Sequence, residues 1–339
     1  MTTSSTQQTQ PMFKTRISGT GSYLPKKVLT NQDLEKIVDT NDQWITERTG
    51  IKQRHIAADD EITSDLAMNA ARRAIEAAGL TATDIDMILV ATVTPDQQMP
   101  STACILQAKL GARPVMAFDI NAACSGFLYG TTIADQFIKA GLYKHILVVG
   151  VEILSRFINY QDRETCILFG DAAGAMVFSR AENGSDSHIL STIIQADGTL
   201  AELLQLTAGG SRNPIAKVNR EKGEHWMSMK GREIFKNAVR TMVQTCQDAL
   251  KNTGMTIDEV NWLIPHQANL RIIESVASYF GLPLDRAIVN VQDTGNTSAA
   301  TIPVAFDQAV RDGRIQRGHN VLLTAFGAGL TSGSVLLRY

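Results

Sequence analysis

Short apolar runs alternate with longer segments of helical periodicity along most of the chain. The runs are four to eight residues long, and they begin at Met87, Val115, Ile146, Ala172, Trp262, Ala287, Val321 and Ser334. Such runs are typical of strands buried on both faces, and the segments between them are long enough for helices. The pattern therefore predicts an α/β fold with largely buried sheets.

The two parts of the chain also resemble each other. AIEAAGLTATDIDMILV from Ala74 matches ALKNTGMTIDEVNWLIP from Ala249 at an offset of 175, and ADQFIKAG from Ala134 matches FDQAVRDG from Phe306 at an offset of 172. Two matches in the same order favour a duplication. We expect a disordered tail over residues 1–12, one α/β half over 13–183 and a second half over 184–339, with a site where the halves meet.

Composition and charge exclude several classes of protein. The 339 residues are 44% hydrophobic and 19% charged, which is unlike a disordered, collagen-like or coiled-coil chain. The net charge of −2 gives no overall basic field for nucleic acid or an anionic membrane. No apolar run reaches the length of a membrane span, and the first residues do not resemble a signal peptide. We expect a cytoplasmic protein.

Cofactor and metal motifs are missing from the sequence. The four cysteines form no CxxC pair, so neither a disulfide framework nor a zinc site is expected. There is no phosphate loop, no HExxH and no GxSxG, and the GTGSYL segment lacks the third glycine of a dinucleotide fingerprint. These absences disfavour a nucleotide-driven or metal-driven reaction.

Three chemical side chains follow predicted strands, where α/β sheets place their ligands. Cys124 lies in a strand-to-helix corner, His266 follows the run WLIP where the first half has Ala91, and Asn296 closes a second corner. An offset of 172 places Cys124 opposite Asn296. Their shared placement predicts one site that draws on both halves.

Each of the three residues also has a structural interpretation. A buried cysteine is often just a small hydrophobic side chain, a histidine at a strand end often only satisfies its surroundings, and Gly-Asn is ordinary turn chemistry. Cys124, however, precedes a nearly uncharged helix whose N-terminal N–H groups and dipole would lower the thiol pKa and favour a nucleophilic thiolate. The local sequence therefore leaves a reactive and a structural Cys124 both open at this point.

Four segments of the chain are distinctive: DINAACSGFLYG, WLIPHQANLRII, TGNTSAATIP and TAFGAGLTSGS. They resemble the segments around the active site of β-ketoacyl-acyl-carrier-protein synthase III, the condensing enzyme that initiates bacterial type II fatty-acid synthesis. The likeness runs from Phe13 to Tyr339. It implies a homodimer with the thiolase-like fold, in which two duplicated α/β halves form five αβαβα layers. It also implies an acyltransferase that condenses an acyl-CoA primer, expected to be acetyl-CoA, with malonyl-acyl carrier protein and needs no cofactor.

The resemblance also implies roles for particular residues. Cys124 would be the nucleophile, His266 and Asn296 would complete the catalytic set, and the backbone N–H groups of Cys124 and Ala328 would bind the oxyanion. Around them the resemblance implies a CoA channel, in which Trp44 and Arg163 would sandwich the adenine, Arg48 would lie near the phosphates and Asn269 near the pantetheine. Phe326 would lie beside the thiolate, and a partner subunit's Met99 would close the acyl pocket. Lys236 and Arg271 would receive the carrier protein.

Some positions depart from the family pattern. Ala328 replaces the middle glycine of AFGGG, which requires backbone angles that alanine tolerates. Ser278 and Tyr279 stand where family members often carry basic residues, which predicts a weaker docking patch, and the flexible Met99 leaves the primer length open.

Three alternatives stay open at this stage. A related condensing enzyme with a longer acyl-CoA or a role in secondary metabolism would keep all three catalytic residues. A thiolase would need a second active-site cysteine in the last segment, which has none. A papain-like Cys–His–Asn protease would carry its cysteine near the N-terminus and would not have duplicated α/β halves.

Overall fold

The computed structural model describes residues 12–339, so that most of the tail predicted over 1–12 lies outside the described residues. The first half builds a five-stranded sheet in the order β1-β7-β6-β4-β5. β4 pairs in parallel with β5 and β6, whereas β7 is antiparallel to both β6 and β1. The strands are β1 (Thr15–Tyr23), β4 (Met87–Ala91), β5 (Met116–Ile120), β6 (His145–Ile153) and β7 (Asp171–Arg180).

The second half builds a four-stranded sheet in the order β11-β12-β13-β8. β11 and β12 are parallel, and the other pairs are antiparallel. A parallel β-bridge joins Leu263 of β11 to Ala287. It lies beside β11 in the place that β5 takes beside β4 in the first sheet. The strands are β8 (His188–Ala196), β11 (Trp262–Pro265), β12 (Asn320–Gly327) and β13 (Thr331–Arg338).

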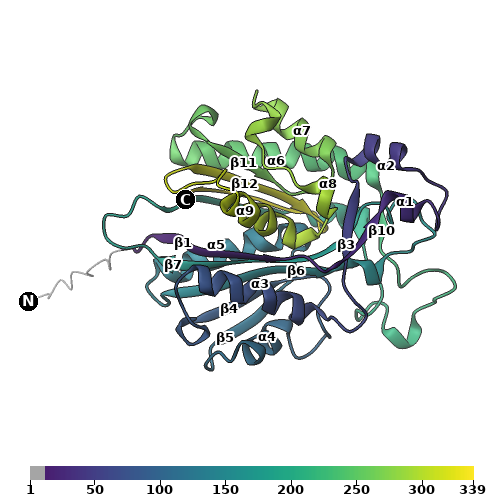
Figure 1. Cartoon of the computed structure of the whole chain (residues 1–339), viewed down its shortest axis with the longest axis horizontal. Coiled ribbons are helices and arrows are strands. Elements are labelled where there is room, and N and C mark those ends of the chain that lie inside the picture. Colours follow the sequence, from purple (N-terminus) through teal and green to yellow (C-terminus); the bar gives the residue numbers. More distant parts are fainter. Residues whose placement is uncertain (1–11) are drawn as a thin grey trace, which may run out of the picture.

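Helices cover both sheets and also fill the space between them, which gives the five αβαβα layers (Figure 1). α3 (Thr63–Ala77) and α4 (Thr102–Leu110) pack on the outer face of the first sheet. α5 (Gly126–Lys139) and α9 (Thr301–Arg311) lie between the sheets, and α6 (Gly231–Thr253) covers the second sheet with α7 (Leu270–Tyr279) beside it. The thiolase-like α/β fold expected from the sequence is confirmed.

Smaller elements surround one end of the layers. They are β2 (Lys27–Thr30), α1 (Asn31–Leu34), α2 (Asp42–Thr49), β3 (Gln53–Ile56), β9 (Leu204–Gln205), β10 (Ser228–Met229) and α8 (Val291–Thr294), together with short 3₁₀ turns that include η2 (Ala123–Ser125) and η8 (Ser298–Ala300). α2 begins where the Asn41 side chain accepts from Trp44 N and ends at Gly50 in the left-handed conformation. These caps fix the direction of a short helix that carries Trp44 and Arg48.

The central core explains why two helices can lie between the sheets. The residues facing it are almost all apolar, and they include the fully buried Phe127 of α5 and Phe306 of α9. Burying one such ring contributes about 2–3 kcal/mol. Residues of β6 alternate accordingly, with Ile146 and Val148 facing α5 and α9, and Leu147 and Val149 facing α3.

The sheet registers show how the halves correspond. Met87 pairs with Ile146 in the first sheet and Trp262 with Val321 in the second, so both strands are offset by 175 residues. The two corners keep this offset, because the non-glycine residues with positive φ in the described part of the chain are Ala123 (φ 46°) and Ser298 (φ 48°).

The offset falls to 172 only at the ends of the corner helices, because α9 has 11 residues and α5 has 14. The sequence alignment that placed Cys124 opposite Asn296 is therefore wrong by three residues. Ala299 is the counterpart of Cys124, and Asn121 is the counterpart of Asn296. Among the helices of residues 12–339, none is both long and apolar enough to cross a membrane.

Candidate active site

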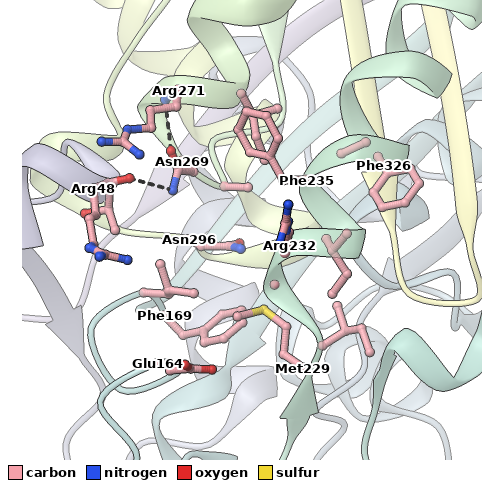
Figure 2. A pocket seen from close by; sticks show the side chains of 18 of the residues that line it. Arg48, Glu164, Phe169, Met229, Arg232, Phe235, Asn269, Arg271, Asn296 and Phe326 are labelled. Carbon is pink, nitrogen blue, oxygen red and sulfur yellow. Dashed lines mark hydrogen bonds between the residues drawn. The ribbon is translucent and has the colours of Figure 1, made fainter.

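A cavity of about 1080 Å³ opens at the end of the layers where the two halves meet. Its lining includes Cys124 from the first half and His266, Asn296 and Phe326 from the second, with exposed arginines toward its mouth. Figure 2 shows Asn296 and Phe326 directed into this space from different elements. The structure thus brings together the three residues that the sequence singled out.

Cys124 lies in η2, at the start of the central helix α5, and is nearly buried. The pKa of the Cys124 thiol is raised to about 12, mainly by burial; the Ser298 hydroxyl and a backbone N–H act to lower it, and the Glu152 carboxylate acts to raise it. The low thiol pKa expected from the helix N-terminus is therefore wrong, because the thiol loses its solvation on burial. At neutral pH Cys124 is therefore a thiol, and a thiolate would form only if a base accepted its proton.

The turn after β12 presses against the backbone of Cys124. A Cβ atom on Gly327 would lie 2.7 Å from Cys124 N, so only glycine allows this approach. Ala328, the next residue, is not one of the described residues with positive φ. The condition for alanine at this position is thus met, and its N–H is retained in the turn beside Cys124.

His266 directly follows β11, and its N–H donates to Thr324 O at 2.8 Å, so the backbone continues the parallel pairing. Its Nδ1 lies 2.7 Å from Thr301 Oγ1, and this hydroxyl is also 3.0 Å from Ser298 O. Burial lowers the pKa of His266 to about 3, so the ring is neutral. Since the hydroxyl can donate or accept, Nε2 can serve the cavity as either base or donor.

Asn296 is held by hydrogen bonds on three sides. Its N–H donates to Leu168 O at 2.8 Å, its carbonyl accepts from Gly170 N at 3.0 Å, and its Oδ1 accepts from Ser298 N at 2.9 Å. Within residues 12–339 no protein atom accepts from Nδ2, although Asn296 lines the cavity. The amide therefore offers its N–H groups to a bound molecule.

Aromatic and basic side chains stack at the mouth of the cavity. The Arg48 guanidinium carbon lies 4.6 Å from the Trp44 ring centre, and that of Arg163 lies 4.9 Å from the same centre. Arg163 Nη1 also donates to Asp39 O at 3.3 Å. The Trp44 ring and the Arg163 guanidinium therefore lie too close together in this structure for an adenine to fit between them, and they would have to move apart to bind one.

Asn269 connects two walls of the mouth (Figure 2). Its Nδ2 donates to Arg48 O at 3.1 Å, and its Oδ1 accepts from Arg271 N at 2.9 Å and caps α7. The side chain thus holds α2 against the start of α7. Arg271 is exposed on the lining, and the exposed Lys236 lies on the first turns of α6, outside the lining.

Met99 does not line this cavity within one chain. Its side chain is 79% exposed, in the loop before α4. Met99, which was expected to close the acyl pocket of a partner subunit, therefore lies on the surface of this chain.

Several residues of the site were missed by sequence reasoning. Arg232 and Phe235 add a cation and an aromatic ring to the cavity lining on α6 (Figure 2). Behind the lining, Thr301 is hydrogen-bonded to His266, Ser298 to Asn296, and Glu152 to Ser298. Glu152 did leave a signal, because it is the one charge in the apolar run ILVVGVEI. The other residues have polar or turn-like neighbours that give no such signal.

No group of three or more His, Cys, Asp or Glu side chains in residues 12–339 is arranged to hold a metal ion. The four cysteines are free thiols; Cys104 is exposed, and Cys124, Cys166 and Cys246 are buried.

Comparisons with known proteins agree over nearly the whole chain. A family model described as 3-oxoacyl-[acyl-carrier-protein (ACP)] synthase III matches residues 118–198, and one for its C-terminal part matches residues 250–339. The β-ketoacyl-[acyl-carrier-protein] synthase III of Thiobacillus denitrificans is 53% identical over 334 residues, which cover 97% of this chain and 100% of that relative.

Solved structures give the same result. The 3-oxoacyl-[acyl-carrier-protein] synthase III of Aquifex aeolicus has a TM-score of 0.89 at 50% identity, covering 96% of this chain and 100% of that one. The priming β-ketosynthase of the R1128 polyketide pathway has a TM-score of 0.91 at 33% identity, covering 98% of both chains.

Proposed function

Because this chain belongs to the β-ketoacyl-acyl-carrier-protein synthase III family, we propose that Cys124, His266 and Asn296 perform the condensation that this family catalyses. The enzyme is an acyltransferase of fatty-acid biosynthesis: it joins an acyl-CoA primer to malonyl-acyl carrier protein and so initiates fatty-acid synthesis. The observation that carries the assignment of residues is the convergence of the three side chains on one cavity.

In the first half-reaction Cys124 takes the acyl group. The neutral His266 ring accepts the thiol proton as sulfur attacks the thioester carbon, which supplies the base that a thiol with a pKa of about 12 requires. The tetrahedral oxyanion receives the N–H groups of Cys124 and Ala328. The carbonyl re-forms, the bond to the CoA sulfur breaks, and the proton passes from His266 to the departing CoA thiolate.

In the second half-reaction malonyl-acyl carrier protein replaces CoA. Loss of CO2 leaves the electron pair as an enolate, and the Asn296 amide and the His266 ring donate to its oxygen. One such donor contributes about 3–4 kcal/mol to a transition state of this kind. The enolate carbon attacks the acyl carbonyl on Cys124, and the tetrahedral intermediate collapses with cleavage of the bond to the Cys124 sulfur, which gives the β-ketoacyl product. The released Cys124 thiolate takes up a proton from water and restores the resting thiol. Two neutral donors suit this site, because a carboxylate there would repel both malonyl and enolate.

The mouth of the cavity suits the rest of a CoA thioester. Trp44 and Arg163 offer two planes for adenine, and Arg48 offers a cation for the phosphates. Asn269 lines the path to pantetheine, and Phe326 forms the apolar wall beside Cys124.

Lys236 and Arg271, together with Arg232, form an exposed basic rim that suits an acidic carrier protein. The overall net charge of −2 makes this rim a local feature of the surface.

We further propose acetyl-CoA as the primer, a homodimer as the working form, the cytoplasm as its location, and a reaction without a cofactor. The dimer is supported by β5, which ends the first sheet and leaves Met116 44% exposed, and by Met99 nearby in sequence. A partner subunit's Met99 would then close the acyl pocket. The side chain is flexible, so the primer length must be measured.

The test is mass spectrometry of the intact protein after brief incubation with acyl-CoAs from acetyl to dodecanoyl, followed by malonyl-acyl carrier protein. Wild type is expected to gain an acetyl group on Cys124 and to lose it during the chase, with acetoacetyl-carrier protein formed. Cys124→Ser should prevent loading, and Cys104→Ser, which removes an exposed thiol, should not.

Loading by long chains alone would reassign the primer and leave the chemistry in place. An enzyme that no acyl-CoA loads would contradict the role of Cys124.

A further inference from the structure

One buried carboxylate behind the site has no part in the reaction described above. Glu152 lies near the end of β6, is fully buried and faces the corner η8. Its carboxylate accepts from Thr94 Oγ1 at 2.7 Å, Thr92 Oγ1 at 3.2 Å, Val93 N at 3.1 Å and Ser298 Oγ at 3.0 Å. A buried charge with no cation beside it is costly, so a structural role alone gives a poor account of it.

The duplication shows what this position does. At the offset of 175 residues, Glu152 corresponds to Gly327, and Ser298 corresponds to Ala123. At the corner of the first half, Gly327 of the second half packs against Ala123 and so lets Cys124 N approach. At the corner of the second half, the equivalent place holds the Glu152 carboxylate of the first half, hydrogen-bonded to Ser298.

Ser298 links this carboxylate to the catalytic amide. It has a positive φ that non-glycine residues rarely adopt, and its hydroxyl donates to Glu152 while its N–H donates to Asn296 Oδ1 at 2.9 Å. The neighbouring residue of the corner, Ala299, presses its carbonyl on Gly150 of β6. The bond from Glu152 thus holds Ser298 in the conformation that orients the Asn296 side chain.

We propose that Glu152 is a positioning residue of the condensation site: through Ser298 it fixes the Asn296 amide with its N–H groups toward the cavity, and its negative charge lies behind the Cys124 thiol. The inference rests on the proposed function for what the amide does. The effect on Cys124 follows from charge alone and does not depend on that function.

Among the groups that surround Glu152, the Cys124 thiol is the one whose ionisation responds to the charge of this carboxylate. Hydroxyl and N–H groups surround the carboxylate, whose pKa burial raises to about 7, so above this pH it is ionised and Cys124 experiences its repulsion. The adjacent strand β7 carries Asp171, whose carboxylate instead accepts from Ala57 N and from Ser155. His266 on the cavity wall is neutral.

Two substitutions separate charge from geometry. Glu152→Gln keeps the length of the side chain and removes the charge, whereas Glu152→Asp keeps the charge and withdraws it from Ser298. Two rates are measured on the full-length enzyme. The first is the alkylation of Cys124 by iodoacetamide between pH 6 and 10, measured on the proteolytic peptide that contains Cys124. The second is the release of CO2 from malonyl-acyl carrier protein.

Glu152→Gln should shift the alkylation profile of Cys124 to lower pH, because less repulsion favours the thiolate, and should keep CO2 release within about threefold of wild type. Glu152→Asp should leave the alkylation profile in place and slow CO2 release about tenfold, the factor for one lost hydrogen bond of ~1.4 kcal/mol. Ser298→Ala should slow CO2 release as Glu152→Asp does, which provides a second route if that variant folds poorly. It should also move the alkylation profile to higher pH, because the Ser298 hydroxyl helps to lower the thiol pKa. Asp171→Asn is the matched buried carboxylate and should not move the alkylation profile.

Equal alkylation profiles in wild type and Glu152→Gln would overturn the electrostatic claim. Equal CO2 release by the Gln, Asp and Ser298→Ala variants would overturn the positioning claim. A wild type that loads no acyl group and releases no CO2 would contradict the proposed function instead, and alkylation would still decide the effect of the charge.

Discussion

At the scale of single residues, burial decides the chemistry of the site. It holds Cys124 as a thiol and His266 as a neutral ring, and both shifts follow mainly from lost solvation. The pair therefore starts the reaction uncharged, with a proton to give on one side and a free ring nitrogen on the other. The residues that decide these states, such as Glu152, stand behind the reacting groups.

Glu152 should make the stability of the protein depend on pH. Burial raises the pKa of Glu152 from 4.5 to about 7, so between these values the folded chain retains a proton that the unfolded chain releases. Stability conferred by this proton is present below pH 4.5 and is lost as pH rises through 7. Between pH 5 and pH 8 the free energy of unfolding, measured with urea, should therefore fall in wild type by about 2–3 kcal/mol more than it falls in Glu152→Gln. An equal loss in both proteins would contradict the raised pKa.

Arg163 should affect substrate binding rather than chemistry. Its guanidinium stacks on Trp44 at the mouth of the cavity, so Arg163→Ala should raise KM for acyl-CoA about fivefold, the effect of ~1 kcal/mol of lost stacking. Steady-state kinetics should find kcat within about twofold of wild type. Arg314→Ala, which breaks an exposed pair with Asp312, is the control and should change neither constant. A fall in kcat at constant KM would argue against a binding role.

At the scale of elements, close backbone contacts bring the site together. Cys124 and Asn296 lie on corners of different halves, and each corner packs against a glycine of a neighbouring strand, Gly327 for the first and Gly150 for the second. A side chain at either glycine would push the corner away. The geometry of the site therefore depends on strands that carry none of its reacting groups.

Gly327→Ala should damage acyl transfer more than stability. Its Cβ would lie 2.7 Å from Cys124 N and would displace one oxyanion donor. We expect the rate of acetyl loading onto Cys124 to fall about 10²-fold. Gly198→Ala is the matched control, because a Cβ there meets open space and its φ is not positive. Loading by Gly327→Ala at the wild-type rate would show that the Cys124 N–H is not needed.

At the scale of the whole molecule, the layered fold leaves the β5 edge of the first sheet, like its β1 edge, without a further partner strand in the described chain. β5 ends that sheet, and the exposed Met116 and Met99 lie on or near it in sequence. Exposed strand edges with apolar side chains are typical sites of association. The proposed dimer would bury this edge.

A charge on that edge should separate the subunits. Met116→Asp is expected to reduce the mass in solution from twice 36.9 kDa to a single chain, as measured by light scattering after gel filtration. Leu142→Asp places the same charge on another apolar residue, 66% exposed and beyond the end of α5, and should leave the dimer intact. A wild type with the mass of one chain would contradict the dimer itself.

The sequence by itself determined the α/β fold, indicated the duplication and singled out the three side chains that we propose to react. Strands buried on both faces leave continuous apolar runs, and Cys124, His266 and Asn296 stand directly after such strands or at corners, where few other residues have this chemistry. The family followed from the same segments. All of these depend on local pattern.

Only the tertiary structure decided the ionisation of the site and the register of its two halves. The helix next to Cys124 predicted a low thiol pKa, but the burial that raises it comes from segments far away in the chain. The overlay of Cys124 with Asn296 failed because α9 is three residues shorter than α5, which a strand register reveals and a helix match does not. Desolvation and register both arise from contacts between distant segments, and local pattern does not encode them.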